Sequence, residues 1–163
     1  MQDNDTGAYR HLDISSQVSM AIGHNNGRLS EEKIDQLEML GADILLMPSQ
    51  YEPCGLAQLY AFRYGTIPIV RATGGLVDTV VNVSDQTCAD GTASGFVFDA
   101  FEPAALEAAV RRAIDAHGNT RLWQDLIRGV MQQDWSWDVS ARKYQEVFSQ
   151  ARANAPVDVV DVR

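Results

Sequence analysis

Two short motifs, EPCG at residues 52–55 and TGG at residues 73–75, hold the residue types best suited to bind a polar ligand. Glu52 offers two carboxylate oxygens, which can accept hydrogen bonds from two adjacent hydroxyl groups. Gly74 and Gly75 have no side chains, so their main chain can approach a ligand closely and present N–H groups to it. The residue types therefore indicate recognition of hydroxyl or phosphate oxygens.

Each motif follows a predicted strand. Residues 44–47 and 67–70 are short apolar runs typical of buried strands, and residues 55–64 between them are compatible with a helix. The apolar positions of this helix are Leu56, Leu59, Tyr60 and Phe62. Two strands joined by a helix predict a right-handed βαβ unit in a parallel sheet. Ligands of open parallel sheets bind beyond the carboxyl ends of the strands, where both motifs are expected to lie.

The rest of the chain predicts an α/β domain over residues 14–153. We expect residues 1–13 to be poorly ordered and residues 154–163 to form a flexible tail. Two further strands are predicted at residues 18–22 and 95–98, which gives four parallel strands, and residues 82–94 between strands are expected to be a surface loop. Further helices are predicted at residues 30–40, 103–116, 119–133 and 139–151.

Composition excludes several function classes. The chain has 163 residues, a net charge of −9 and 45% apolar residues, which fits one soluble domain without nucleic-acid or membrane partners. No apolar run is long enough to cross a bilayer, and the first residues do not resemble a secretory signal. The two cysteines, Cys54 and Cys88, fit neither a disulfide framework nor a metal site. We expect a cytoplasmic protein.

Each site residue also has a structural interpretation. Glu52 is equally well explained as an acid that interacts with the dipole of the following helix. The commonest role of a free cysteine such as Cys54 is that of a small buried apolar residue, and we do not expect a nucleophile there. The TGG motif on its own is more often a tight turn, and we expect Asp78 to cap or orient it.

A longer stretch carries a specific resemblance. Residues 47–80, MPSQYEPCGLAQLYAFRYGTIPIVRATGGLVDTV, resemble the signature of the C-terminal domain of bacterial glycogen synthases and plant starch synthases. The resemblance continues through ADG at residues 89–91, SGFVF at 94–98 and DWSW at 134–137. Members of that family are retaining glucosyltransferases of the GT-B fold, in which two Rossmann-like domains face each other.

The resemblance implies a donor-binding domain with a Rossmann-like parallel sheet flanked by helices. It makes Glu52 the candidate catalytic residue, since the matching glutamate contacts the donor glucose. The donor-binding residues that it implies are Glu52, Cys54, Gly55, Tyr60, Thr73, Gly74 and Gly75. The implied donor is ADP-glucose, the acceptor is an α-1,4-glucan, and neither a metal nor a cofactor is needed.

The sequence also departs from the family pattern. Nothing corresponds to the N-terminal GT-B domain, nor to the strands whose arginine and lysine neutralise the diphosphate, and we assign that role to no residue here, Arg71 included. Gln50 stands where the family usually has arginine, and the adenine-contacting tyrosine expected near residues 23–26 is absent. We therefore expect a fragment, a truncated product or half of a split enzyme, with a missing N-terminal domain as partner. A non-catalytic binding module and a degenerate remnant remain alternatives.

Overall fold

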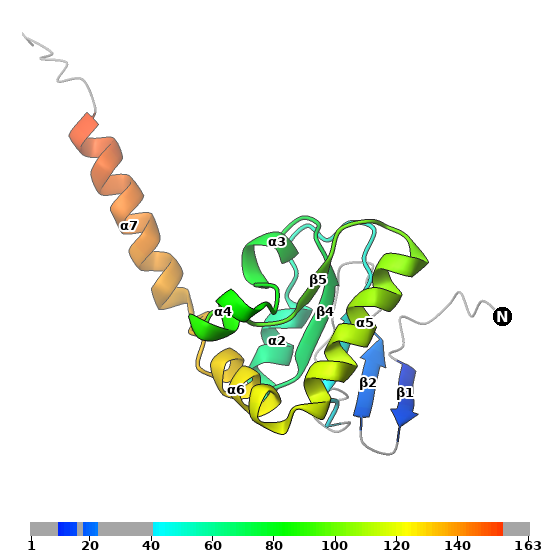
Figure 1. The fold of residues 1–163 in the computed structure, drawn as a ribbon. Coiled ribbons are helices and arrows are strands. Elements are labelled where there is room, and N and C mark those ends of the chain that lie inside the picture. Colours follow the sequence, from blue (N-terminus) through cyan, green and yellow to red (C-terminus); the bar gives the residue numbers. More distant parts are fainter. Residues whose placement is uncertain (1–9, 16–17, 23–40, 155–163) are drawn as a thin grey trace, which may run out of the picture. The chain divides into compact units, whose positions relative to one another are not determined.

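The computed structural model describes residues 10–15, 18–22 and 41–154. The chain forms two compact units, residues 1–133 and residues 134–163. The described part of the first unit contains a sheet and helices α2 to α6, and that of the second unit contains helix α7 (Figure 1). Both candidate motifs belong to the first unit.

The first unit is built on a five-stranded sheet with the strand order β1-β2-β3-β4-β5. The strands are β1 (Arg10–Ser15), β2 (Val18–Ile22), β3 (Ile44–Met47), β4 (Ile67–Arg71) and β5 (Phe96–Phe98). Strands β2 to β5 are parallel, and only β1 runs antiparallel to its neighbour. The prediction of four parallel strands is confirmed.

The N-terminal region differs from the expectation. Residues 10–13 belong to β1, although the polar, aperiodic sequence predicts poor order there. Main-chain pairing with β2 explains this strand, because ladder hydrogen bonds need no apolar periodicity. The predicted helix at residues 30–40 lies outside the described residues, as do residues 1–9 and 155–163.

Most predicted helices are present, with shifts at their ends. The helices are α2 (Ala57–Tyr64), α3 (Leu76–Thr79), α4 (Asp85–Ala89), α5 (Pro103–Gly118), α6 (Thr120–Met131) and α7 (Trp137–Asn154). Helix α4 lies in the segment predicted to be a surface loop, and a capping box between Ser84 and Thr87 stabilises its start. Gly65 ends α2 in the left-handed conformation, with φ 76°.

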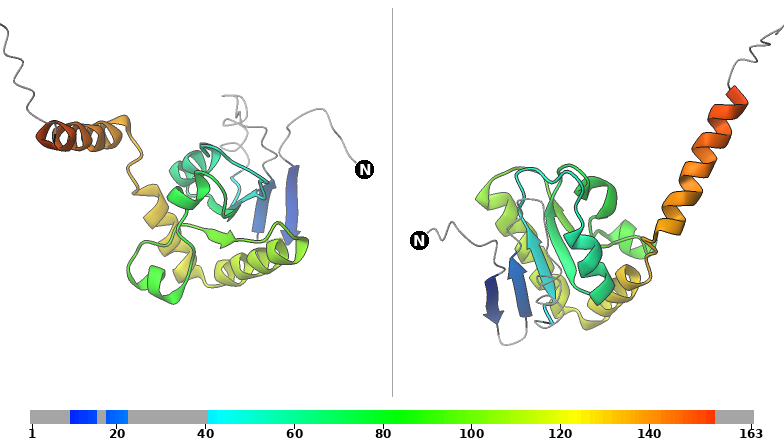
Figure 2. Two further views of the ribbon diagram at one scale, coloured as in Figure 1. Left: turned by 90° about the horizontal axis from the view of Figure 1, so that it is seen from above. Right: turned by 180° about the vertical axis from the view of Figure 1, so that it is seen from behind.

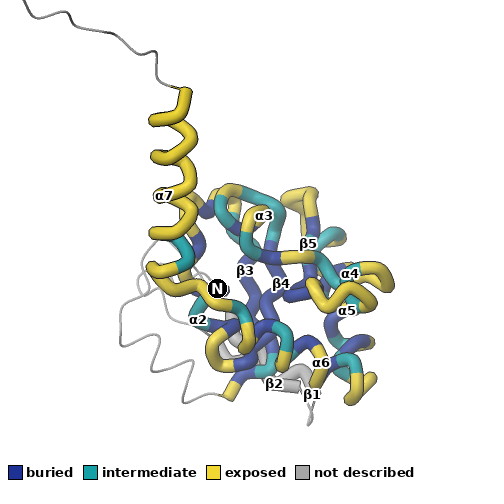
Figure 3. Tube along the Cα trace, turned by 90° about the vertical axis from the view of Figure 1, so that its left-hand side faces the viewer, coloured by how far each residue is buried: buried dark blue, intermediate teal, exposed yellow. Residues whose placement is uncertain are grey.

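The core lies on both sides of the two central strands. Every residue of β3 is buried, and so are residues 67–70 of β4 (Figure 3). Helices α2 and α5 cover opposite faces of the sheet (Figure 2). The buried face of α2 differs from the predicted one. Its buried residues are Ala57, Gln58, Ala61 and Phe62. Leu56, which precedes the first helical turn, is 57% exposed.

Helix α7 is the helix of the second unit's described residues. It is longer than predicted, and none of its residues is buried. The rings of Tyr144 and Phe148 stack with their centroids 6.3 Å apart, which places these two predicted apolar positions on one side of the helix.

Candidate functional site

The EPCG loop, residues 48–56, connects the carboxyl end of β3 to helix α2 (Figure 1). Glu52 is only 3% exposed, and its Oε1 accepts a hydrogen bond of 3.2 Å from the main-chain N–H of Gly55. Gly55 adopts φ 64°, which closes this short turn. Helix α2 begins two residues later, at Ala57, so the prediction that the helix starts at residue 55 is wrong.

The TGG loop, residues 72–75, leaves the carboxyl end of β4 and packs directly on the EPCG loop. A Cβ atom on Gly74 would lie 1.8 Å from the carbonyl oxygen of Glu52, and one on Gly75 would lie 2.4 Å from that of Cys54. The N–H of Gly75 donates a 3.0 Å hydrogen bond to the Glu52 carbonyl. The close contact between the two main chains therefore requires glycine at both positions, whether or not these residues also bind a ligand.

Some main-chain donors of the two loops are left for a ligand. Among residues 41–154, the N–H groups of Cys54, Thr73 and Gly74 donate no hydrogen bond. Cys54 and Gly74 are exposed, and Thr73 is half-buried. Helix α2 also begins without a side-chain cap. Such N–H groups are suited to phosphate or hydroxyl oxygens.

The structure brings together six of the seven predicted site residues, those in the two motifs. Tyr60 lies on α2 and is half-buried, with no hydrogen bond or ring contact from its side chain among the described residues. Asp78 is an exposed residue in the first turn of α3, where its charge suits the helix dipole. In place of Asp78, the hydroxyl of Thr79 bonds to the TGG loop, donating to the Gly75 carbonyl at 2.9 Å.

Arg71, to which the sequence analysis assigned no role, lies next to the two loops. Its Nη1 donates to the carbonyl of Gln50 at 2.6 Å, and its Nε donates to the carbonyl of Asp99 at 3.1 Å. Its guanidinium also lies 5.4 Å from the ring centroid of Phe101. Arg71, the last residue of β4, thus joins the segments that follow β3 and β5. The signal in the sequence was a cation at the end of a buried apolar run.

Gln58 is the second residue that sequence reasoning missed. It is fully buried on α2 and donates hydrogen bonds to Gly55 and Thr79, one in each half of the site. The available signal was a polar residue among the small and apolar residues of one helix face.

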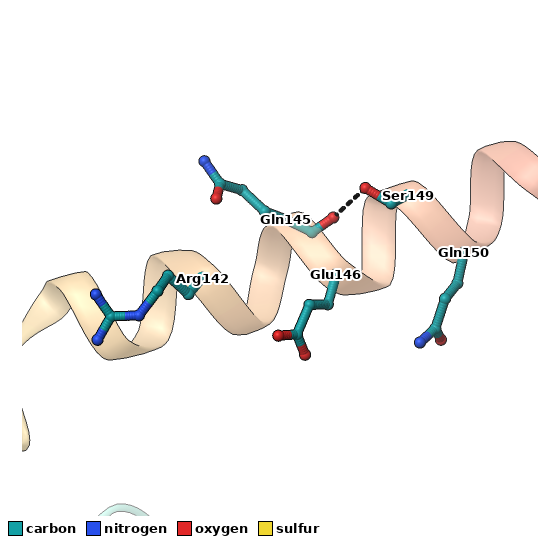
Figure 4. A pocket seen from close by; sticks show the side chains of 5 residues that line it. All are labelled: Arg142, Gln145, Glu146, Ser149 and Gln150. Atoms are coloured by element: carbon teal, nitrogen blue, oxygen red, sulfur yellow. Dashed lines mark hydrogen bonds between the residues drawn. The ribbon is translucent and has the colours of Figure 1, made fainter.

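The other candidate sites are less suited to bind a ligand. A shallow hollow along α7 is lined only by residues of that helix (Figure 4). They are Arg142, Gln145, Glu146, Ser149 and Gln150. One helix face cannot enclose a ligand. The hydroxyl of Ser149 already donates a hydrogen bond to the Gln145 carbonyl. Within the described ranges, no three metal-ligating side chains gather, and no helix has the length and apolar character to cross a membrane.

Comparison with known proteins identifies the family. Residues 23–125, which include both loops of the site, match the family described as Glycosyl transferases group 1. The chain belongs to this family. Within it, the chain is 45% identical over 134 residues to a glycogen synthase of Nitrosomonas eutropha, covering 82% of this chain and 26% of that protein. It is 48% identical over 118 residues to a glycogen synthase of Nitrosospira multiformis, covering 72% and 24%.

A solved structure of a starch synthase also resembles this chain. The catalytic domain of starch synthase IV from Arabidopsis thaliana, bound to ADP and acarbose, superposes with a TM-score of 0.64 at 34% identity. The alignment covers 76% of this chain and 25% of that one. The resemblance to glycogen and starch synthases and the α/β fold of GT-B glycosyltransferases are confirmed. The chain spans about a quarter of the length of the relatives it matches.

Proposed function

We propose that this chain is the donor-binding part of a glycogen or starch synthase. The complete enzyme would transfer glucose from ADP-glucose to the non-reducing end of an α-1,4-glucan in the cytoplasm, retaining the anomeric configuration. It would use neither a metal nor an organic cofactor. The names of the relatives and the ADP bound to the starch synthase domain support this choice of donor.

One observation supports the proposal most strongly. The EPCG and TGG loops follow neighbouring parallel strands and touch main chain to main chain at the carboxyl edge of the sheet. The N–H groups of Thr73 and Gly74 are suited to the diphosphate oxygens of a nucleotide-sugar. Cys54 and Gly55 would contact the donor through their main chain, and Tyr60 would lie near the nucleotide.

Glu52 is proposed to bind the donor glucose and to act in catalysis. Glu52 is 3% exposed and its Oε1 accepts the Gly55 N–H, so a sugar hydroxyl can reach the carboxylate only after a local rearrangement. The proposal therefore includes a rearrangement on donor binding that makes the carboxylate accessible to sugar hydroxyls, whose hydrogen bonds it can accept beside that of Gly55.

A partner domain is proposed to cover the same edge of the sheet. Four large apolar side chains in the segments after β3, β4 and β5 are at least half exposed. They are Tyr51, Leu56, Val77 and Phe101. Exposed apolar groups concentrated at one edge are typical of an interaction surface. We propose that an N-terminal GT-B domain packs here and supplies the acceptor contacts.

Calorimetric titration of the purified chain with ADP-glucose, UDP-glucose and ADP tests the donor site. We expect saturable binding that favours ADP-glucose and weakens in Glu52→Ala. Glu107→Ala is the matched control, because it removes the same charge from an exposed position on α5. Absence of binding at millimolar donor, or equal binding by Glu52→Ala and the wild type, would contradict the proposal.

A second experiment separates catalysis from binding alone. The chain is mixed with a separately produced N-terminal domain of a glycogen synthase, and transfer of glucose to a glucan is measured. We expect turnover only in the mixture, because two domains are needed to orient donor and acceptor. Binding without turnover in the mixture would instead indicate a non-catalytic binding module.

A further inference from the structure

Gln58 is a polar residue in an apolar environment. Its exposed fraction is zero, and its buried neighbours on α2 are Ala57, Ala61 and Phe62. Burying an amide is unfavourable unless hydrogen bonds replace those lost with water. The hydrogen bonds of the Gln58 side chain therefore indicate why a polar residue occupies this position.

The Gln58 amide nitrogen links the two loops of the site. Nε2 donates to the carbonyl of Gly55 at 2.5 Å and to the hydroxyl of Thr79 at 2.9 Å. The Thr79 hydroxyl in turn donates to the carbonyl of Gly75 at 2.9 Å. A continuous chain of hydrogen bonds thus runs from the EPCG loop through two side chains to the TGG loop.

The orientation of the amide follows from its acceptors. A carbonyl such as that of Gly55 can only accept, so nitrogen must face it, and the opposite orientation would bring two oxygens together. This leaves Gln58 Oε1 buried and without a hydrogen-bond partner among the described residues. A buried oxygen without a hydrogen bond destabilises the fold. We therefore attribute the presence of an amide at this position to the two hydrogen bonds that its nitrogen donates.

Gly75 is held from both sides by these interactions. Its N–H donates to the Glu52 carbonyl at 3.0 Å, and its carbonyl accepts the hydroxyl of Thr79, which Gln58 orients. A peptide segment fixed at both its donor and its acceptor has little freedom to rotate. Gly75 therefore ties the TGG loop, which carries the N–H groups of Thr73 and Gly74, to the EPCG loop.

We propose that Gln58, acting through Thr79, is a positioning residue that fixes the TGG loop against the EPCG loop, so that both present their N–H groups to one ligand. This inference rests on the proposed donor-binding function of the two loops. Gln58 does not touch the ligand, because its side chain is fully buried. Its effect on binding is indirect.

The test compares variants that remove the link with one that removes an equivalent bond elsewhere. Gln58→Met and Thr79→Val delete the amide and the hydroxyl with similar side-chain volumes, whereas Thr79→Ser keeps the hydroxyl. Thr66→Val is the matched control. Thr66 is buried at the amino end of β4, on the edge of the sheet opposite the site, and donates to the Ala42 carbonyl at 2.8 Å.

The first measurement is hydrogen exchange of the Gly75 amide by NMR, with the slowest amides of β4 as reference. Losing one hydrogen bond of ordinary strength predicts roughly tenfold faster local exchange in Gln58→Met and Thr79→Val. Thr79→Ser should restore the wild-type ratio, and Thr66→Val should not change it. If Gln58→Met fails to fold, the two Thr79 variants carry the same comparison. An unchanged ratio in Thr79→Val overturns the inference.

The second measurement is ADP-glucose affinity by calorimetry. If the wild type binds, Thr79→Val should bind roughly tenfold more weakly, with Thr79→Ser and Thr66→Val near the wild type. Faster exchange without weaker binding overturns the inference. If the wild type does not bind ADP-glucose, the proposed donor site fails. Hydrogen exchange alone then decides whether Gln58 positions the two loops.

Discussion

Replacing Gly74 by alanine tests the contact on which the candidate site depends. The added Cβ would lie 1.8 Å from the Glu52 carbonyl oxygen, and Gly74 has φ 50°. A left-handed backbone costs a residue with a Cβ about 1–2 kcal/mol, and overpacking typically costs about 1–3 kcal/mol. The two contributions predict that Gly74→Ala lowers the free energy of unfolding by about 2–5 kcal/mol.

Three other glycines separate the two contributions. Gly91 has φ 69° with nothing within 4 Å of an added Cβ, so Gly91→Ala measures backbone strain alone. Gly75 has no positive φ, but its added Cβ would lie 2.4 Å from the Cys54 carbonyl oxygen, so Gly75→Ala measures overpacking alone. Gly129, within α6, has neither problem, and alanine there should stabilise by about 0.5–1 kcal/mol because of its helix propensity.

The assay is denaturant-induced unfolding of the wild type and the four variants under identical conditions. We expect Gly74→Ala to be the least stable, Gly75→Ala and Gly91→Ala to be intermediate, and Gly129→Ala to exceed the wild type. A Gly74→Ala stability within about 0.5 kcal/mol of Gly91→Ala, the usual error of such comparisons, would refute the close contact between the EPCG and TGG loops.

Three further predictions concern other named interactions. Arg71→Met should lower the free energy of unfolding by about 1–2 kcal/mol in a denaturant titration, because it removes the charged donor to the carbonyls of Gln50 and Asp99. An unchanged free energy of unfolding would contradict the bridging role of Arg71. Asn119→Ala should cost about 1 kcal/mol in the same assay, since its side chain caps α6, and Asn119→Asp should retain most of the stability. The main-chain hydrogen bond from Ser136, 2.9 Å long, lowers the pKa of the Asp134 carboxyl below its ordinary 3.8. The stabilisation that it gives is therefore present above that value and is lost as pH falls through the lowered pKa. NMR titration should show this midpoint moving upward in Ser136→Pro, and an ordinary midpoint in the wild type would contradict the assignment.

The sequence alone determined the elements that build the site. Strands β3, β4 and β5 are short apolar runs between turn residues. This local pattern is enough to predict them as strands, because their apolar side chains are mostly buried. The starts of α5 and α6 also follow from local signals, namely Pro103 at the start of one helix and Asn119 before the other. Parallel pairing then placed both loops at one edge.

The sequence predicted less about burial and about segments without strong periodicity. It placed Leu56 on the apolar face of α2, yet the helix begins after it and buries Gln58 instead. It predicted no structure at β1 or α4, whose stability comes from pairing with β2 and from the Ser84–Thr87 capping box. Apolar periodicity carries no information about hydrogen bonds of either kind.

Only the tertiary structure decided how the candidate site is organised. The motifs indicated that Glu52 and the TGG glycines could serve a ligand. The structure adds that Glu52 is buried, and that its carbonyl holds Gly75. Gln58 and Thr79 are 21 positions apart, and they meet because β3 and β4 pair in one register and end together. Contacts over that separation depend on strand register and main-chain direction, which residue types alone do not specify.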